Sequence, residues 1–241
     1  MRVYVGVDNR EPEAFAVLAH TIRKRASCDV DITPLEINRL RSAGLLTRLM
    51  DSRSHQLYDL ASNAPCSTEF AISRFLVPIL AQSGFALFMD SDMVALGDFA
   101  ELTKLADPRF AVQVVKHDYR PAEQFKMDMQ AQTTYPRKNW SSVMLFNCDH
   151  PANRRLTVAD VNVRRGFDLH QFYWLADSEI GELPAEWNWL VGVQPKPKAP
   201  KIAHFTLGGP WFKDWQPKPY DDIWVCEARD AGVWPGVRDV A

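Results

Sequence analysis

Short apolar runs alternate with segments of helical period along this chain. The run VYVGV at residues 3–7 predicts a strand, and apolar residues at helical spacing between positions 15 and 22 predict a helix directly after it. Four later runs predict further strands: FALFM at 85–89, FAVQVV at 110–115, SVMLF at 142–146 and KIAHFT at 201–206. This alternation favours an α/β fold with a mainly parallel central sheet and helices on both of its faces.

A second helix is indicated by STEFAISRFLVPILA at residues 67–81. Ser67 or Thr68 can cap its start, and Pro78 is expected to kink it or to end it early. Its apolar face is formed by Phe70, Phe75, Leu76, Ile79 and Leu80. The later stretch 118–139 is polar and shows no regular period.

Length and composition predict a soluble single domain over residues 1–241. The apolar share is 46%, the charged share 24% and the net charge -2, so no surface for nucleic acid or membrane is indicated. The first residues do not have the pattern of a secretion signal, and no window reaches the roughly 18 apolar residues of a membrane span. The four cysteines are far apart in sequence, which argues against a zinc knuckle or a disulfide framework and favours a reducing cytoplasm.

Two carboxylates follow the predicted strand 85–89 in the string FMDSDM. In extended backbone, Asp90 and Asp92 point to the same side while Ser91 points away. Two carboxylates this close repel each other unless a cation lies beside them, and a hard divalent metal meets that need. The alternative is a polar strand end whose aspartates cap a turn.

Four sequence blocks resemble glycosyltransferase family 8, which has the GT-A fold. FALFMDSDMVALGDFAEL resembles the family's DxD segment, and STEFAISRF resembles the arginine-bearing helix that precedes it. NWSSVMLFNCDH resembles the segment FNSGVMLIN, and IAHFTLGGPW resembles HxxGxxKPW. The blocks follow the family's order from residue 3 to about residue 212, so the resemblance implies a nucleotide-sugar glycosyltransferase over most of the chain.

The resemblance implies a metal site and a phosphate site. Asp90, Asp92 and His204 would bind Mn²⁺ (or Mg²⁺), with Asp92 the most direct ligand and Asp90 shared between metal and ribose. Two oxygens and one imidazole suit manganese better than calcium. Gly208 and Gly209 would bring backbone amides close to the phosphates. His204 could instead be a core histidine, and the glycines could form a plain turn.

The resemblance also places the nucleotide at the end of the first strand, at Val7, Asp8 and Asn9. Asp8 would accept a hydrogen bond from uracil, or else it caps the helix that follows. Arg74 extends either to solvent or to the sugar nucleotide, and we favour the nucleotide. Its loss is then expected to lower activity with little effect on stability.

Two departures from the family pattern affect other positions. The family's phosphate-contacting lysine before Pro-Trp is replaced by Gly209, and Lys213 is a candidate to take over its charge. The family's DQD segment has a weak counterpart at residues 168–171, where Asp168 and Gln171 are the catalytic candidates and Gln171 is expected near the anomeric carbon.

An aromatic excess late in the chain indicates an acceptor site. Trp187 and Trp189 share a face if the backbone is extended, Asn188 lies between them, and indole faces stack on sugars. Trp211 adds to this group. The same tryptophans could merely cover the core.

The predicted function is therefore metal-dependent transfer of a hexose from a nucleotide diphosphate sugar, most simply UDP, to an acceptor hydroxyl. The resemblance implies retention of configuration. An inverting enzyme would need a carboxylate base, for which Asp168, Asp177 and Glu179 are available. One alternative is a haloacid dehalogenase-type phosphatase with Asp90 as nucleophile and Asp92 as acid-base, and another is a non-catalytic sugar-binding module.

Overall fold

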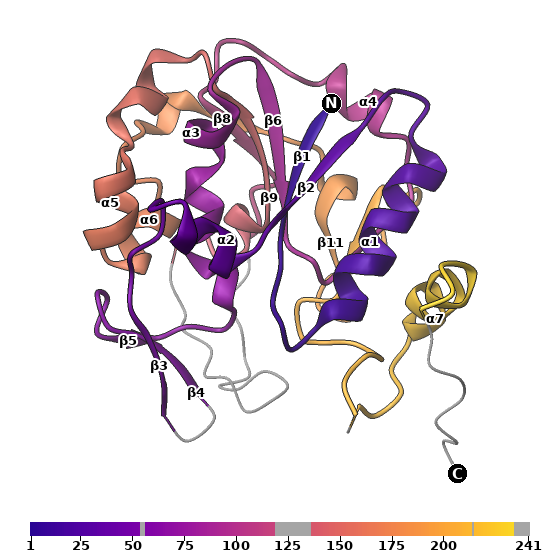
Figure 1. Ribbon diagram of the computed structural model, residues 1–241. Coiled ribbons are helices and arrows are strands. Elements are labelled where there is room, and N and C mark those ends of the chain that lie inside the picture. Colours follow the sequence, from indigo (N-terminus) through magenta and orange to yellow (C-terminus); the bar gives the residue numbers. More distant parts are fainter. Residues whose placement is uncertain (54–55, 119–135, 214, 234–241) are drawn as a thin grey trace.

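The computed structural model describes residues 1–53, 56–118, 136–213 and 215–233. Its main sheet has six strands in the order β10-β8-β9-β6-β1-β2 (Figure 1). Their bounds are β1 (Arg2–Gly6), β2 (Asp31–Leu35), β6 (Phe85–Met89), β8 (Val112–Val114), β9 (Val143–Asn147) and β10 (Ile180–Glu182).

Strand directions in this sheet are mixed, although parallel pairs predominate. β1 pairs in parallel with β2 and β6, and β8 pairs in parallel with β10. β9 runs antiparallel to both β6 and β8. The expected α/β fold is confirmed, and so are the predicted strands at 3–7, 85–89, 110–115, 142–146 and 201–206 in their central parts.

Two small sheets accompany the main one. One has the order β11-β12-β7 and the other the order β3-β4-β5. Their bounds are β7 (Met93–Ala95), β11 (Trp189–Leu190), β12 (Ile202–His204), β3 (Met50–Arg53), β4 (Gln56–Asp59) and β5 (Ala64–Pro65).

Helices cover both faces of the main sheet, with α1 and α4 on one side and α2, α3, α5 and α6 on the other, while α7 packs against α1 and β7 (Figure 1). The α-helices are α1 (Pro12–Arg25), α2 (Ile37–Ser42), α3 (Val77–Ala81), α4 (Phe99–Thr103), α5 (Val158–Val163), α6 (Gly166–His170) and α7 (Asp221–Asp230). Short 3₁₀ helices are η1 (Glu69–Ala71), η2 (Ser73–Leu76), η4 (Trp140–Ser142), η5 (Pro151–Arg155), η6 (Asp177–Glu179) and η7 (Ala185–Asn188). Within the described ranges, no helix combines the length and the apolar character needed to cross a bilayer.

The central strands alternate between the two cores because successive side chains point to opposite faces. In β6, Leu87 and Met89 pack with α1, whereas Phe88 packs on the face covered by α2, α3 and α5. β6 is therefore buried on both faces. Asp90 is the first residue after β6 and lies at the end of the sheet.

The single helix predicted over residues 67–81 is wrong. The segment forms η1 and η2 followed by the short α3, and Thr68 precedes η1 without a side-chain cap hydrogen bond. Pro78 lies in the first turn of α3, where its missing N–H has no intrahelical partner to lose. It therefore begins a helix here and does not kink one.

Candidate active site

A cavity of about 360 Å³ opens at the carboxyl end of β6. Asp90, Asp92 and Arg74 contribute to its wall. The remaining lining comes from residues within 59–72, 138–142 and 165–170. In an α/β sheet, loops diverge at the carboxyl ends of the strands, so a ligand site is expected there.

Asp90, Asp92 and His204 converge, as the sequence analysis predicted. Their ligand-type atoms all lie within 4.8 Å of one another, and His204 Nε2 is 3.3 Å from Asp92 Oδ1. The antiparallel pairing of β12 with β7 brings His204 opposite Met93, and the Phe205 N–H donates to the Asp92 carbonyl at 2.8 Å. Two residues more than 100 positions apart are thus joined by strand register.

The alternation predicted for FMDSDM is also present. Asp90 and Asp92 line the cavity, whereas Ser91 is buried with 1% of its surface exposed and takes no part in the described lining. The Asp90 N–H donates to the Ser142 carbonyl at 3.0 Å, which ties the turn to the segment before β9.

Asn188 orients His204, although it was predicted to contact the acceptor. It is fully buried, and its Nδ2 donates to Ser142 Oγ at 2.9 Å. Its Oδ1 lies 2.9 Å from His204 Nδ1 and can only accept, so Nδ1 donates to it and the Nε2 side of the ring faces Asp92. Because its amide already contacts Ser142 and His204, a contact of Asn188 with the acceptor stays a prediction. An oriented imidazole and two carboxylates fit Mn²⁺ or Mg²⁺.

Arg74 lies inside the cavity wall and not at the surface. Only 5% of the residue is exposed, and its guanidinium lies over the rings of Phe70 and Phe88. NH1 is 2.9 Å from Asp90 Oδ1 and donates to the Ser141 carbonyl at 2.7 Å. Arg74 therefore belongs to the site and neutralises one of the two carboxylates.

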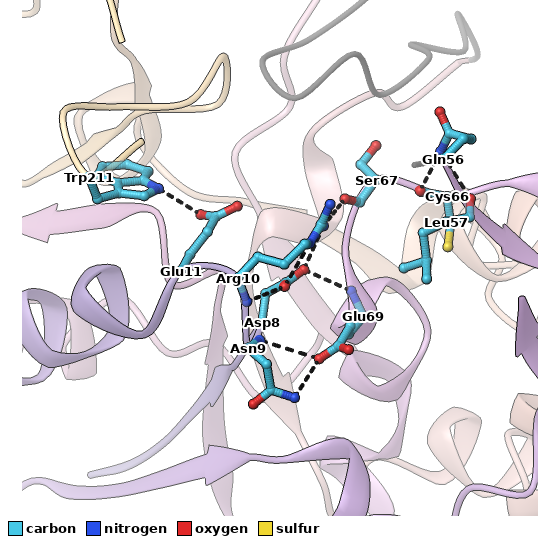
Figure 2. A network of polar contacts seen from close by, with 10 residues as sticks. All are labelled: Asp8, Asn9, Arg10, Glu11, Gln56, Leu57, Cys66, Ser67, Glu69 and Trp211. Carbon is cyan, nitrogen blue, oxygen red and sulfur yellow. Dashed lines mark hydrogen bonds and ion pairs between the residues drawn. The ribbon is translucent and has the colours of Figure 1, made fainter. Parts of the chain in front are cut away.

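At the end of β1, the Asp8 carboxylate is engaged within the protein (Figure 2). It is fully buried and accepts from Arg10 N–H at 3.0 Å, Nε at 2.9 Å and NH2 at 2.7 Å, and from the Glu69 N–H at 3.1 Å. Burial raises the pKa of Asp8, but the Arg10 bonds and charge, helped by Glu69, outweigh it and hold the pKa below its ordinary value. Asp8 does not cap α1, whose N-cap position is Glu11.

The neighbours of Asp8 are tied to the same network. Asn9 is exposed and donates through N and Nδ2 to Glu69 Oε2, at 3.3 and 3.0 Å, and Val7 is half-buried. Asp8 and Asn9 therefore both form hydrogen bonds with Glu69 inside the protein. A contact of Val7, Asp8 and Asn9 with a nucleobase stays a prediction.

Gly208 and Gly209 are required by the local structure. Gly208 has φ 98°, a conformation that side chains disfavour, and its N–H donates to the Phe205 carbonyl at 2.8 Å. A Cβ on Gly209 would lie 2.2 Å from the Trp211 ring. The Gly208 amide is thus already paired, and Lys213 is exposed and outside the described cavity lining.

Three tryptophans predicted at the acceptor site pack elsewhere. Trp187 is 2% exposed against Phe99, and Trp189 is 1% exposed and donates to the Gln194 carbonyl. A shared face required extended backbone, but Trp187 lies in the 3₁₀ helix η7, and the two residues enter two different core clusters, which agrees with the alternative that they cover the core. Trp211 is half-buried, packs against Phe205 and donates to Glu11 Oε2 at 3.1 Å (Figure 2).

The two catalytic candidates, Asp168 on α6 and Gln171 directly after it, are not part of the described lining. Asp168 pairs at 3.0 Å with Arg165, which does line the cavity, and the Gln171 amide donates to the Pro136 carbonyl. His170, between them, lines the cavity instead. The roles of Asp168 and Gln171 therefore stay predictions.

His170 and Lys138 are cavity residues that the sequence analysis did not identify. His170 Nδ1 is 2.7 Å from Ser141 Oγ, and its ring meets Phe75 edge to face. Burial lowers the pKa of His170 well below its usual value, and the charges of Arg74 and Lys138 lower it further. The imidazole is neutral near pH 7. His170 lies in the DLHQ segment at residues 168–171, and its position between the two catalytic candidates is the sequence signal that could have identified it.

Comparison with known proteins gives one close sequence relative. The chain is 45% identical over 235 residues to Protein CDI of Arabidopsis thaliana, covering 95% of this chain and 86% of the relative. No profile of a known protein family matches the chain.

Solved structures of low sequence identity share the fold. The glycosyltransferase GlyE of Streptococcus pneumoniae superposes with a TM-score of 0.59 at 13% identity, over 94% of this chain and 59% of GlyE. The chain thus spans about three fifths of GlyE. The galactosyltransferase LgtC, solved with donor and acceptor sugar analogs, gives a TM-score of 0.55 at 14% identity, over 99% of this chain and 98% of LgtC. The fold is that of the GT-A glycosyltransferases.

Proposed function

The chain belongs to the same family as Protein CDI, and from its fold and its acidic cluster we propose that it is a metal-dependent glycosyltransferase. It transfers a hexose from a nucleotide diphosphate sugar, UDP-hexose, to a hydroxyl group of a carbohydrate or glycoconjugate acceptor. The observation that carries the proposal is the convergence of Asp90, Asp92 and His204 at the cavity of a GT-A fold.

Asp90, Asp92 and His204 would hold Mn²⁺ or Mg²⁺. When bound, such an ion stabilises the negative charge that develops on the departing diphosphate. The protein contributes the orientation of the ligands: Asn188 orients the ring of His204, and Arg74 holds Asp90. Arg74 also limits the repulsion between the two carboxylates before any ion arrives.

Retention of configuration is the stereochemical outcome that we propose. An inverting transfer needs a carboxylate base beside the acceptor hydroxyl. The three carboxylates available from the sequence are all paired with arginines, Asp168 with Arg165, Asp177 with Arg137 and Glu179 with Arg155. None of the three belongs to the cavity lining in the described part of the chain. In a retaining transfer the departing phosphate can accept the acceptor proton, so no such base is required.

The two other candidate functions are less well supported. In a haloacid dehalogenase-type phosphatase, Asp90 would be a nucleophile, but here Arg74 pairs with it, and the fold is that of glycosyltransferases. A sugar-binding module without activity would not need an imidazole oriented next to two carboxylates. We propose a cytoplasmic location, in keeping with four free cysteines, and no nucleic-acid partner.

Incubation with UDP-hexoses and Mn²⁺, without acceptor, tests this function. A glycosyltransferase slowly hydrolyses the donor in a metal-dependent reaction, a phosphatase prefers simple phosphate monoesters, and a binding module does neither. We expect slow hydrolysis of UDP-hexose that stops when the metal is chelated. Thermal shifts with UDP-, GDP- and CMP-sugars then test the base, because a ligand that binds only the folded state raises Tm.

A further inference from the structure

Five large apolar side chains are exposed among the described residues, and four of them come from the stretches 49–60 and 163–167. Leu49 and Val163 are each 68% exposed, Phe167 is 49% exposed and Leu60 is 42% exposed. The fifth, Tyr220, lies at the start of α7. A single exposed apolar side chain is ordinary, whereas several at one place indicate an interaction surface.

Hydrogen bonds bring three of these four residues together. The Leu60 N–H donates to the Leu49 carbonyl at 3.2 Å, one position beyond the paired ends of β3 and β4. The Arg48 N–H donates to Asn162 Oδ1 at 3.1 Å, which joins the residue before Leu49 to the residue before Val163. Adjacent Cα atoms are only about 3.8 Å apart, so the exposed residues on these joined segments are near neighbours. The small sheet with β3 and β4 lies on the same side of the molecule as α5 and α6 (Figure 1).

The fourth residue, Phe167, connects this group with the cavity. The Gly166 N–H donates to Ser62 Oγ at 2.7 Å, which joins the residue before Phe167 to the turn that follows Leu60. Ser62, Gly166 and Phe167 all line the cavity that contains Asp90. The exposed group therefore continues into the candidate active site. We call it the apolar rim, and its members are Leu49, Leu60, Val163 and Phe167.

A buried ion pair fixes the backbone beneath the apolar rim. Arg48 is 3% exposed, and its Nε donates to Asp59 Oδ1 at 2.8 Å. Its NH1 donates to the Val161 carbonyl at 2.9 Å, and its NH2 donates to Ser62 Oγ at 2.8 Å. One guanidinium thus holds all three segments that carry the rim or adjoin it. A surface that is held in place before a ligand arrives binds at a lower entropic cost.

The exposed charges next to the rim are balanced. Two arginines separate Val163 from Gly166, and each pairs with an acid on its own helix or in the next turn. Arg164 Nε is 3.2 Å from Asp160 Oδ1, and Arg165 NH2 is 3.0 Å from Asp168 Oδ1. These arginines therefore provide little attraction for an anionic lipid surface or an acidic peptide. The apolar side chains favour a group that is uncharged and apolar.

We propose that the apolar rim binds an apolar aglycone of the acceptor, so that the acceptor is an amphiphilic glycoside. This rests on the proposed function, in which the donor diphosphate lies at Asp90 and Asp92. The acceptor hydroxyl has to reach the donor inside the cavity, and the remainder of the acceptor leaves past Phe167. An alkyl or aryl group attached to the acceptor sugar covers the rim there, and its transfer out of water stabilises the complex.

Titration calorimetry with the full chain, Mn²⁺ and UDP tests this assignment. The probes are methyl, hexyl and octyl β-glucosides and the same three β-galactosides, all below the concentrations at which they form micelles. Octyl glycosides should bind at least about tenfold more tightly than methyl glycosides, because each covered CH₂ adds roughly a factor of three to affinity. The double variant Leu49→Ser/Val163→Ser should reduce that gain at least about threefold, and each single variant should remove part of it.

Tyr220→Ser is the matched control, because it removes the exposed large apolar side chain that lies outside the rim. It should keep the full gain with chain length. Both rim positions are largely exposed, so thermal melts should show that the double variant stays folded. A gain that is equal in wild type and in the folded double variant would show that the alkyl chains bind elsewhere, which overturns the assignment.

Further outcomes separate this inference from the proposed function and from other occupants of the rim. If wild type shows no metal-dependent hydrolysis of UDP-hexose, the proposed function fails, and the acceptor assignment fails with it. If hydrolysis occurs but affinity does not increase with chain length in either series, only the acceptor assignment is overturned. It is also overturned if wild type is a dimer that the double variant dissociates, or if wild type binds phosphatidylcholine vesicles and the double variant does not, since the rim then contacts a second copy or a membrane.

Discussion

Two clusters among the described residues combine two carboxylates with one histidine, and they differ in what surrounds them. Asp90, Asp92 and His204 form one cluster, and His20, Glu227 and Asp230 form the other. In each, the candidate ligand atoms lie within 4.8 Å of one another. Residue types and distances alone would therefore predict the same chemistry for both.

The cluster between α1 and α7 is neutralised by its own lysine and arginine. Lys24 Nζ lies 3.0 Å from Glu227 Oε2 and 2.8 Å from Asp230 Oδ2, and Arg25 pairs with Glu227. The side chain of Asp230 is 52% exposed, so water screens its charge further. This cluster is an interhelical ion-pair network that needs no metal.

The cluster at the end of β6 is enclosed and less fully compensated. The side chains of Asp90, Asp92 and His204 are only 14%, 18% and 2% exposed. Arg74 pairs with Asp90, while Asp92 faces an imidazole whose other nitrogen is held by a neutral amide. The comparison teaches that burial and the local counter-charges, more than the number of acids, distinguish the proposed metal site from an ion-pair network.

The largest expected effect separates the two clusters directly. Asp92→Asn should abolish Mn²⁺-dependent transfer and lower metal-dependent UDP binding by at least about tenfold, because it removes a charged ligand. The metal-free variant should be as stable as wild type or more so, since two repelling charges become one. Transfer assays, calorimetry and thermal melts measure the three quantities.

Asp230→Asn is the matched control, because it makes the same change in the ion-paired cluster. We expect unchanged Mn²⁺-dependent UDP binding in that variant. Metal-dependent turnover retained in Asp92→Asn would show that the two aspartates only cap the strand end, and the comparison between the clusters would lose its basis.

The sequence predicted the candidate metal ligands better than the residues that hold them in place. Asp90 and Asp92 could be placed because strand alternation and a recognisable motif fix their direction. Asn188 could not, because its role depends on η7 lying beside β12, which no local pattern encodes. Lys138 stood in an aperiodic stretch, and Trp187 was assigned to sugar because an indole in the sequence carries no sign of its burial.

The same division applies to the fold. Apolar runs predicted the central strands, but the antiparallel direction of β9 depends on pairing between distant segments. β2 was missed because it is a polar edge strand containing Pro34, with only Leu35 fully buried. The segment 67–81 kept helical spacing in its apolar residues, which did not reveal the breaks between η1, η2 and α3.

Arg74→Ala should cause the next largest effect, and here the structure reverses the expectation of little change in stability. Removing a buried guanidinium leaves Asp90 without its partner, at a general cost of about 2–4 kcal/mol. Mn²⁺ should restore part of the lost stability, because its positive charge balances that of Asp90. Urea unfolding without the ion measures the loss, and unfolding with the ion measures the recovery. Arg109→Ala, which breaks a pair whose arginine side chain is 79% exposed, is the control and should change stability little. A metal-free Arg74→Ala as stable as wild type would contradict the assigned pairing.

Glu11 provides a smaller effect that depends on pH. Burial, together with the charges of Asp92 and Asp8, raises its pKa from 4.5 to about 8. The folded protein therefore holds this proton more tightly than the unfolded chain, and the associated stability, complete below about pH 4.5, is lost as pH rises through about 8. In metal-free Glu11→Gln that decline should be smaller than in wild type, whereas exposed Glu182→Gln should follow wild type. Parallel pH curves for Glu11→Gln and wild type would contradict the prediction.

The ion-paired cluster should give the smallest effect, and that effect should depend on salt and pH. The pKa of Glu227 is lowered because the bonds and charges of Arg25 and Lys24 outweigh its burial, and hydrogen bonds from Lys24 and His20 lower the pKa of Asp230. Lowered carboxyl pKa values mean stability that is present above the unfolded pKa and lost as pH falls through the folded pKa. Lys24→Met should therefore lower Tm by no more than about 3 °C near pH 7, and the difference should vanish in strong acid or about 1 M salt, because exposed pairs are screened. If Mn²⁺ instead raised the Tm of the protein, and raised it more in Lys24→Met, lysine and metal would compete for this cluster. The two clusters would then not differ in metal binding.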